Sequence, residues 1–404
     1  MTEPDPIPLE TAPPPPPPTR PPPPPPPALP MPPTRPSRWR TFLAVALSVL
    51  GVLLVVAIVA GFLIHVDKVL ISPGEATPLD SSVVMISGAP TYDNPNHVLF
   101  LTVRVSNEDP TLWRYVVASL DPDIDIEDRT NVVGCLSPED NVTYNTLLMG
   151  QSQNDAKYVA LTRLGYTVTA DPARVTVVYA CPGAPAYGIV NVGDRVVALG
   201  NDPVSSSAQL VTLVRAHEPG ETLDITVERD GVTRVAKVVA GRISADGTKC
   251  KAVDPGGVQR GHDDTGAACI GQASQDFVMY HFPIDVTINT DRVGGPSAGL
   301  AFTLAIIDQL TPGKLTDGKR VAVTGAIAND GTVEPVGGVE QKAITARRNG
   351  VQLMMVPKSE VRDARKGAGG MKVVGVATLD DALAALEHAG GASVPHVASV
   401  AARS

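Results

Sequence analysis

Gly294-Gly295-Pro296-Ser297-Ala298-Gly299-Leu300 and the apolar run Ala301 to Ile307 that follows predict a glycine-rich loop entering a buried helix. Pro296 stands near the predicted first turn, where its missing N–H and fixed φ are tolerated. Ser297 then lies at a helix amino terminus, where unpaired N–H groups and the positive dipole end favour negative charge. Such a serine has two interpretations, a helix cap or a nucleophile whose attacked carbonyl oxygen is held by those N–H groups.

A second segment, from Gly325 to Gly350, supplies a candidate base. Residues 339–348 predict a helix, and Lys342 lies at the edge of its apolar stripe. The lysine could simply extend its ammonium group into solvent. Burial, however, disfavours the ammonium form and would give a neutral amine near pH 7 that accepts the proton of a serine hydroxyl. A histidine triad is the weaker interpretation, because no G-x-S-x-G elbow or His/Asp/Ser order frames Ser297.

These segments together resemble the proteolytic domain of Lon proteases over most of residues 275 to 390. The matching blocks are Gly295 to Gly299, Val323-Thr324-Gly325, and Pro335 to Gly338 with Lys342. The resemblance implies a Ser297/Lys342 dyad and a hydrogen bond from Thr324 that orients the lysine. It also implies an oxyanion site built from the backbone near the serine, with support from Gly295, Pro296 and Ala298.

The chain departs from Lon proteases in two places. The residues before the serine block, Asp285 to Gly294, lack the usual histidine-bearing strand and Lys-Asp pair. No G-x-x-x-x-G-K-[ST] loop occurs, and Gly313-Lys314-Leu315 lacks both the hydroxyl residue and the preceding glycine. We therefore expect ATP-independent cleavage of unfolded or extended protein segments, with no cofactor and no metal.

The middle of the chain resembles a bacterial PDZ domain. Gly193 to Gly200 reads GDRVVALG, and a predicted strand from Leu223 to Arg229 ends in Asp230-Gly231. PDZ domains bind extended peptides by adding a strand to a sheet edge. The resemblance implies a peptide groove near the strand Val175 to Ala180, with Val175, Val177 and Tyr179 as peptide-binding residues.

The amino-terminal part predicts a membrane anchor. Thr41 to Ile64 contains no charged residue and is long enough to cross a bilayer. Arg35, Arg38 and Arg40 precede it, which by the positive-inside rule places the amino terminus in the cytoplasm and the body of the protein outside. A cleaved signal peptide is the weaker alternative. Before the anchor, Pro13 to Pro36 is a polyproline tract, either a spacer or a docking segment.

Charge and cysteine content add further bounds. The formal net charge of −9 and the lack of a dense basic block exclude a nucleic-acid binder. All four cysteines lie on the predicted exported side, where disulfides form. Of the three pairings, we favour Cys250 with Cys269 and Cys135 with Cys181.

The sequence therefore predicts an α+β protein with a single transmembrane helix. Its expected parts are a Pro-rich cytoplasmic tail (1–40), a transmembrane anchor (41–64), a β-rich extracytoplasmic segment (65–130), a PDZ-like domain (131–245), a Lon-like proteolytic domain (246–390) and a flexible tail (391–404). Expected partners are protein or peptide substrates and the membrane, and a homo-oligomer stays open. The alternatives are a catalytically inactive PDZ-based adaptor and a structural envelope protein.

Overall fold

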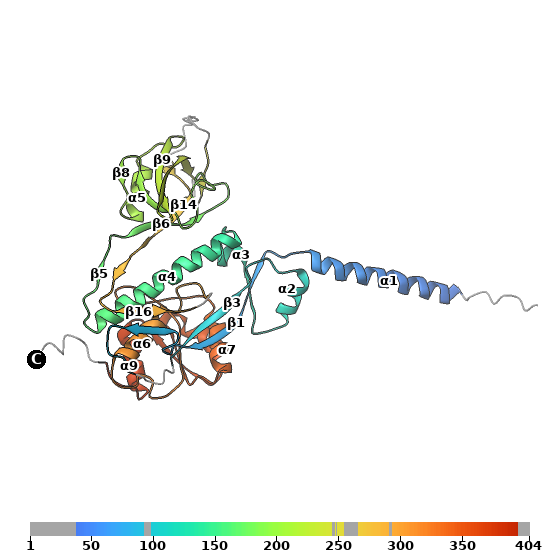
Figure 1. Ribbon diagram of the computed structural model, residues 1–404. Coiled ribbons are helices and arrows are strands. Elements are labelled where there is room, and N and C mark those ends of the chain that lie inside the picture. The colour runs from blue at the N-terminus through green and yellow to red at the C-terminus, as the bar shows by residue number, and fades with distance from the viewer. Residues whose placement is uncertain are drawn as a thin grey trace, which may run out of the picture. The chain divides into compact units, whose positions relative to one another are not determined.

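The computed structural model describes residues 38–92, 98–244, 247, 249–253, 266–290 and 293–394. The predicted polyproline tract and most of the predicted flexible tail lie outside these ranges, as does Asn94-Pro95-Asn96, a sequence typical of turns. In the described part, helices and strands mix as the sequence predicts (Figure 1).

The first element is a long apolar helix, α1 (Arg38–Leu63). It has 26 residues, a mean hydropathy of 3.1 over its most apolar window and side chains exposed along nearly its whole length. At 1.5 Å per residue it measures about 39 Å, more than the hydrocarbon core of a bilayer. The helix is therefore long and apolar enough to cross a membrane, as residues 41–64 predict.

A six-stranded mixed sheet forms the centre of the part of the chain that carries Ser297 and Lys342. Its strand order is β21-β20-β17-β3-β1-β4. The strands from β21 to β3 run parallel, whereas β1 pairs antiparallel with both β3 and β4. The bounds are β1 (Lys68–Pro78), β3 (Val98–Val105), β4 (Asp125–Asp128), β17 (Val321–Val323), β20 (Leu353–Pro357) and β21 (Lys372–Val376).

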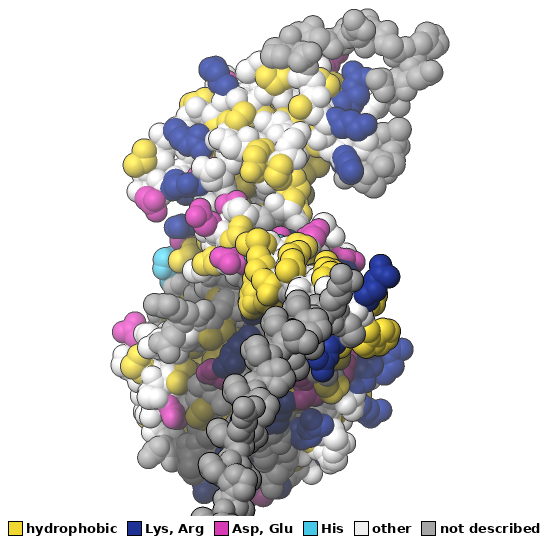
Figure 2. Space-filling model, turned by 90° about the vertical axis from the view of Figure 1, so that its right-hand side faces the viewer, with side chains coloured by type: hydrophobic (Ala, Val, Ile, Leu, Met, Phe, Trp, Pro, Cys, Tyr) yellow, Lys and Arg dark blue, Asp and Glu magenta, His cyan; other side chains and the backbone are white. Residues whose placement is uncertain are grey.

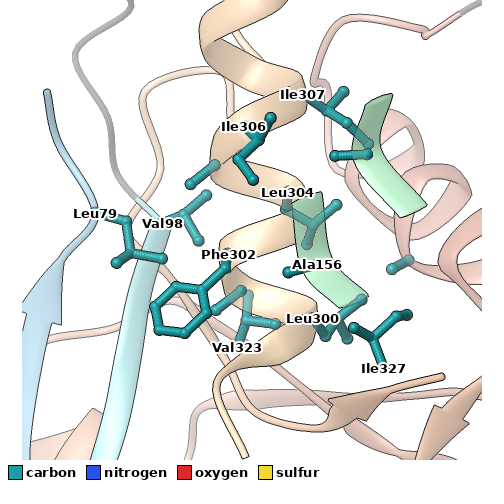
Figure 3. Packing of buried hydrophobic residues seen from close by; sticks show 14 of the residues in the cluster. Leu79, Val98, Ala156, Leu300, Phe302, Leu304, Ile306, Ile307, Val323 and Ile327 are labelled. Atoms are coloured by element: carbon teal, nitrogen blue, oxygen red, sulfur yellow. The ribbon is translucent and has the colours of Figure 1, made fainter. Parts of the chain in front are cut away.

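Alternate side chains of each strand point to opposite faces of this sheet. Both sets are apolar in β3, and helices cover both faces. On one face Val98 and Phe100 join a core with α4 (Pro138–Arg163), α6 (Gly299–Leu310) and α9 (Leu379–His388). Figure 3 shows Phe302 of α6 pointing toward Leu79 and Val98. On the other face Leu99 and Leu101 pack with α7 (Val339–Arg348) and α8 (Val361–Ala368).

Short elements complete this part. They are β2 (Val84–Ser87) paired with β16 (Asp285–Ile288), β18 (Ala326–Ile327) paired with β19 (Val333–Glu334), α2 (Leu112–Ser119), α3 (Arg129–Val132) and the 3-10 turn η1 (Lys358–Glu360).

A second sheet has its own hydrophobic core and the order β10-β9-β7-β6-β14. Its strands are β6 (Arg174–Ala180), β7 (Arg195–Leu199), β9 (Thr222–Arg229), β10 (Val232–Val239) and β14 (Gln272–Phe277), with β8 (Asp202–Pro203) beside β7 and the helix α5 (Ser207–Arg215). A small sheet joins β11 (Gly241–Ile243), β12 (Cys250–Lys251) and β13 (Ala268–Cys269). The chain enters and leaves through a two-stranded ribbon of β5 (Thr169–Ala170) and β15 (Tyr280–His281).

The sheets do not follow the predicted domain boundaries. The strands β1 and β3, expected in a separate β-rich segment, belong to the six-stranded mixed sheet. The strand β14 lies beyond residue 246 but pairs with β6 in the second sheet. The local hydrophobic pattern predicts where a strand forms. It does not predict which strand, distant in the chain, will pair with it.

The cysteines pair as favoured from the sequence. Cys135 is bonded to Cys181 and Cys250 to Cys269, and none of the four is free. Such bonds persist in oxidising compartments.

Candidate active site

Hydrogen bonds to α4 hold the loop that carries Ser297. The N–H of Gly295 donates to the carbonyl oxygen of Asn145 at 2.9 Å. The hydroxyl of Ser152 donates to the carbonyl oxygen of Pro296, also at 2.9 Å. Gly295 has a φ of 88°, a backbone conformation that side-chain-bearing residues rarely adopt. The half-buried Ser297 is thus carried on a loop tied to a rigid helix.

The backbone around Ser297 leaves two donors for an oxyanion. α6 begins at Gly299, so Pro296, predicted near the first turn of the helix, lies in the loop shortly before it. Pro296 has no N–H, and the N–H of Gly295 is already bonded. Within the described residues, the N–H groups of Ser297 and Ala298 donate to no other group. Of the three predicted support residues, only Ala298 therefore offers a donor, and Ser297 adds a second.

Lys342 lies in the second turn of α7 and is only 2% exposed. The sequence predicts it at the edge of the apolar stripe, but β1 and β3 pack over that edge. The start of the helix lies tightly against β3, since a β-carbon on Gly338 would lie 2.8 Å from Val103 Cγ1. This packing keeps the lysine amine away from bulk water.

Thr324 links the lysine to the serine. Lys342 Nζ donates to Thr324 Oγ1 at 3.2 Å, and Thr324 Oγ1 donates to the carbonyl oxygen of Ser297 at 3.2 Å. The N–H of Gly325 donates to the same carbonyl oxygen at 2.9 Å. Among the described residues, Lys342 Nζ forms no direct hydrogen bond with Ser297 Oγ. The threonine hydroxyl thus lies between the amine and the serine backbone.

Ser297 and Lys342 line one cavity of about 740 Å³. Gly295, Pro296 and Ala298 line it too, together with residues of β3 from Phe100 to Val105. A cavity of this size accommodates several residues of an extended peptide. The two predicted catalytic side chains therefore face a common space that a substrate can enter.

Burial lowers the pKa of Lys342 from 10.5 to about 8, and the charge of Glu360 opposes part of that shift. Desolvation destabilises the ammonium form more than the neutral amine. Glu360 itself has a pKa raised by burial, and its Oε2 accepts a hydrogen bond from the N–H of Val336 at 3.0 Å. A sizeable fraction of Lys342 is consequently uncharged just above neutral pH, as a general base requires.

Comparison with known proteins finds two domain families in the chain. Residues 271–386 match the Lon protease (S16) C-terminal proteolytic domain, and residues 149–239 match the PDZ domain. The chain carries a Lon-type proteolytic domain and a PDZ domain. Ser297, Thr324 and Lys342 all lie within the match to the Lon-type domain.

Individual relatives agree with the match to the Lon-type domain. The chain is 30% identical over 127 residues to the Lon protease of Rickettsia bellii, covering 30% of this chain and 16% of that protein. It is 42% identical over 69 residues to the Lon protease of Treponema pallidum, covering 17% of this chain and 8% of that protein. The chain thus spans less than a fifth of the length of these relatives.

A solved structure, the PDZ domain of the SdrC-like protein from Listeria innocua, is 18% identical. The alignment covers 25% of this chain and 92% of the Listeria innocua chain, with a TM-score of 0.19.

The predicted peptide-binding strand of the PDZ domain is wrong. β6 pairs with β14 on one side and with β7 on the other, so it has no free edge for an added strand. Val175 and Val177 are buried in the domain core, and the hydroxyl of Tyr179 accepts a hydrogen bond from the N–H of Cys135. The sheet ends instead at β14, which the sequence places far from the other PDZ strands.

A cavity of about 500 Å³ lies along β14. It is lined by Leu210, Val211 and Val214 of α5 and by the stretch Gln272 to Ser274 of β14. A free strand edge beside an apolar helix face is the geometry of strand addition.

Sequence reasoning missed three groups near the catalytic residues. Asn145 and Ser152 belong to a helix that the sequence assigns to the PDZ-like part, so nothing in the pattern links them to Ser297. Glu360 follows β20 by three residues and looks like a surface carboxylate in the sequence. Within the described ranges, no group of three His, Cys, Asp or Glu side chains is placed to hold a metal ion.

Proposed function

We propose that this protein is a serine endopeptidase in which Ser297 is the nucleophile and Lys342 the general base. The observation that carries the proposal is the buried amine of Lys342, bonded to Thr324, facing the same cavity as Ser297. A buried, uncharged amine can activate a hydroxyl without a histidine.

The reaction follows from this geometry. Neutral Lys342 accepts the proton of Ser297 Oγ as the oxygen attacks the carbonyl carbon of a peptide bond. The N–H groups of Ser297 and Ala298 hold the resulting oxyanion. The lysine ammonium then gives its proton to the leaving amine, and the C–N bond breaks. A water molecule, deprotonated by the same amine, hydrolyses the acyl-enzyme and restores the serine.

Cleavage is proposed to need no ATP and to act on unfolded or extended segments of exported or membrane proteins. The sequence contains no phosphate-binding loop. The groove between α5 and β14 is the proposed site at which the PDZ domain holds an extended peptide.

The catalytic part is proposed to face outside the cell behind a single-pass anchor, with the amino terminus in the cytoplasm. The length and apolarity of α1 support the anchor, whereas Arg38 and Arg40 at its start and the two disulfide bonds support the orientation.

The test compares the full chain in detergent, without ATP, with its Ser297→Ala and Lys342→Met variants on an unfolded protein substrate. We expect cleavage to fall by at least about a thousandfold in both variants, the scale seen when a nucleophile or its base is removed. Measurement of peptide release and of substrate binding separates the two functions. Binding with no cleavage in the parent would favour the adaptor, and cleavage that persists in either variant would contradict the dyad.

A further inference from the structure

α2 (Leu112–Ser119) turns an apolar stripe toward solvent. Trp113 is 38% exposed, Val117 66% and Leu120 79%, and Val116 is exposed as well. These residues recur at intervals of three and four, so they lie on one face of the helix. The opposite side is the packed one, where Ala118 is buried. Soluble helices bury such a stripe, whereas among the described residues this one stays largely exposed.

The stripe begins at the end of α1. The Trp113 indole packs directly on Gly61, where any β-carbon would overlap the ring. The N–H of Leu112 donates to the carbonyl oxygen of Ile64 at 2.8 Å, and His65 bridges to Thr111. Gly61 lies two residues before the last residue of α1, about 3 Å along the helix axis. Trp113 is therefore fixed at the level where α1 ends.

Polar groups beside α2 fit a phospholipid headgroup region. A cavity of about 220 Å³ next to α2 is lined by Val117 together with Arg114 and Arg104, and Arg104 also forms an ion pair with Glu75 at 2.9 Å. Figure 2 shows one face of the molecule, on which hydrophobic side chains gather with Lys and Arg side chains beside them. Tryptophan is enriched where hydrocarbon meets headgroups, and arginine pairs with phosphate.

We propose that α2 is an interfacial helix that docks on the phospholipid surface from which α1 emerges, with Trp113, Val116, Val117 and Leu120 inserted at the headgroup level. This goes beyond the proposed protease activity and rests on the proposed membrane span of α1. Docking at two points, α1 and α2, would fix the orientation of the catalytic part relative to the bilayer. The acidic residues Asp121, Asp123 and Asp125 that follow α2 would repel anionic headgroups, so the docking is tested on zwitterionic lipid.

The experiment uses the full chain reconstituted in phosphatidylcholine vesicles. The chain has two tryptophans, so Trp39→Phe leaves Trp113 as the sole tryptophan and Trp113→Phe leaves Trp39 to report on α1. We expect lipids brominated near the headgroup to quench Trp113 more strongly than lipids brominated deep in the chain. The double substitution Val117→Asp with Leu120→Asp should reduce that quenching several-fold while Trp39 stays quenched.

A second probe reports on the far end of α2. All four cysteines are in disulfides, so Leu120→Cys can be labelled singly with a polarity-sensitive fluorophore, with the neighbouring Ser119→Cys as its matched control. We expect a blue-shifted, iodide-protected signal at position 120 and a water-exposed one at 119. Equal iodide access at both positions with Trp39 quenched would overturn the docking but leave the anchor intact, whereas unquenched Trp39 would remove the anchor and the docking together. Protection that rises with the protein-to-lipid ratio would assign the stripe to a second copy of the chain and overturn the lipid assignment.

Discussion

Lys342 shows a conflict between folding and chemistry. Its pKa falls from 10.5 to about 8 on burial, and each unit corresponds to about 1.4 kcal/mol, so the buried amine costs about 3 kcal/mol at neutral pH. The sign follows from proton binding: between pH 8 and 10.5 the unfolded chain holds the proton and the folded chain does not, so stability rises with pH there. Below pH 8 the full cost applies. An apolar side chain of similar size would avoid it, which favours a catalytic reason for the lysine.

The charge on Glu360 is expected to set the pH range of cleavage. It stabilises the ammonium form of Lys342, so Glu360→Gln should lower the pKa of the lysine further and shift the acid limb of the pH profile of kcat/KM downward, by on the order of one pH unit. The glutamine keeps an oxygen that can accept the hydrogen bond from the N–H of Val336.

The matched control is Asp363→Asn, which removes the same charge from an exposed carboxylate paired with Lys366. It should leave the limb in place. A limb that stays fixed in Glu360→Gln, or that moves to higher pH, would show that Glu360 does not act on the base.

Among the helices and strands, those with a complete local pattern are predictable and those defined by their partners are not. The helix at 339–348 has its start, stripe and glycine stop in one short stretch, and it forms at the predicted residues. β14 has no such pattern, because Gln272 to Phe277 is polar and gains its place only by pairing with β6. The same limit explains why the sequence points to Ser297 and Lys342, which lie in locally patterned segments, but not to Asn145 and Ser152.

The contact of α4 with the serine loop gives a prediction for that helix. Ser152 Oγ holds the carbonyl of the Pro296–Ser297 peptide, so Ser152→Ala should let that peptide group and its N–H donor move. We expect kcat to fall about tenfold, equivalent to about 1.4 kcal/mol, with KM nearly unchanged. The acid limb of the pH profile should not shift, because the lysine is untouched.

Thr146→Ala is the control on the same helix, since that hydroxyl bonds only to the helix carbonyl of Val142. This variant should have the kcat and KM of the parent. If both variants have parental kcat, α4 does not position the nucleophile.

The whole molecule is organised as one domain within another. The catalytic sheet takes β1, β3 and β4 from before the PDZ domain and β17, β20 and β21 from after it. The chain leaves at β5 and returns at β15, where the two strands pair and the N–H of Asp171 donates to the carbonyl oxygen of Met279 at 2.9 Å. We propose that the PDZ domain is inserted within the Lon-type domain. The sequence patterns divide the chain into successive domains and therefore do not predict this arrangement.

This arrangement predicts that the PDZ domain can be removed without loss of catalysis. Because the ends of the insertion are already hydrogen bonded, residues 171–279 can be replaced by a short Gly/Ser turn, with Cys135→Ser to avoid a free thiol. We expect the shortened protein to fold and to cleave a fully unfolded substrate within a few fold of the parent, since Ser297, Thr324, Lys342 and α4 remain. It should lose any preference among substrates that depends on peptide binding along β14.

The Cys135→Ser/Cys181→Ser variant of the full chain separates loss of the disulfide from loss of the domain. A shortened protein that is inactive or unfolded, beside an active double-cysteine variant, would mean that the PDZ domain is a structural part of the catalytic unit, because the protease core would then depend on contacts across the ribbon.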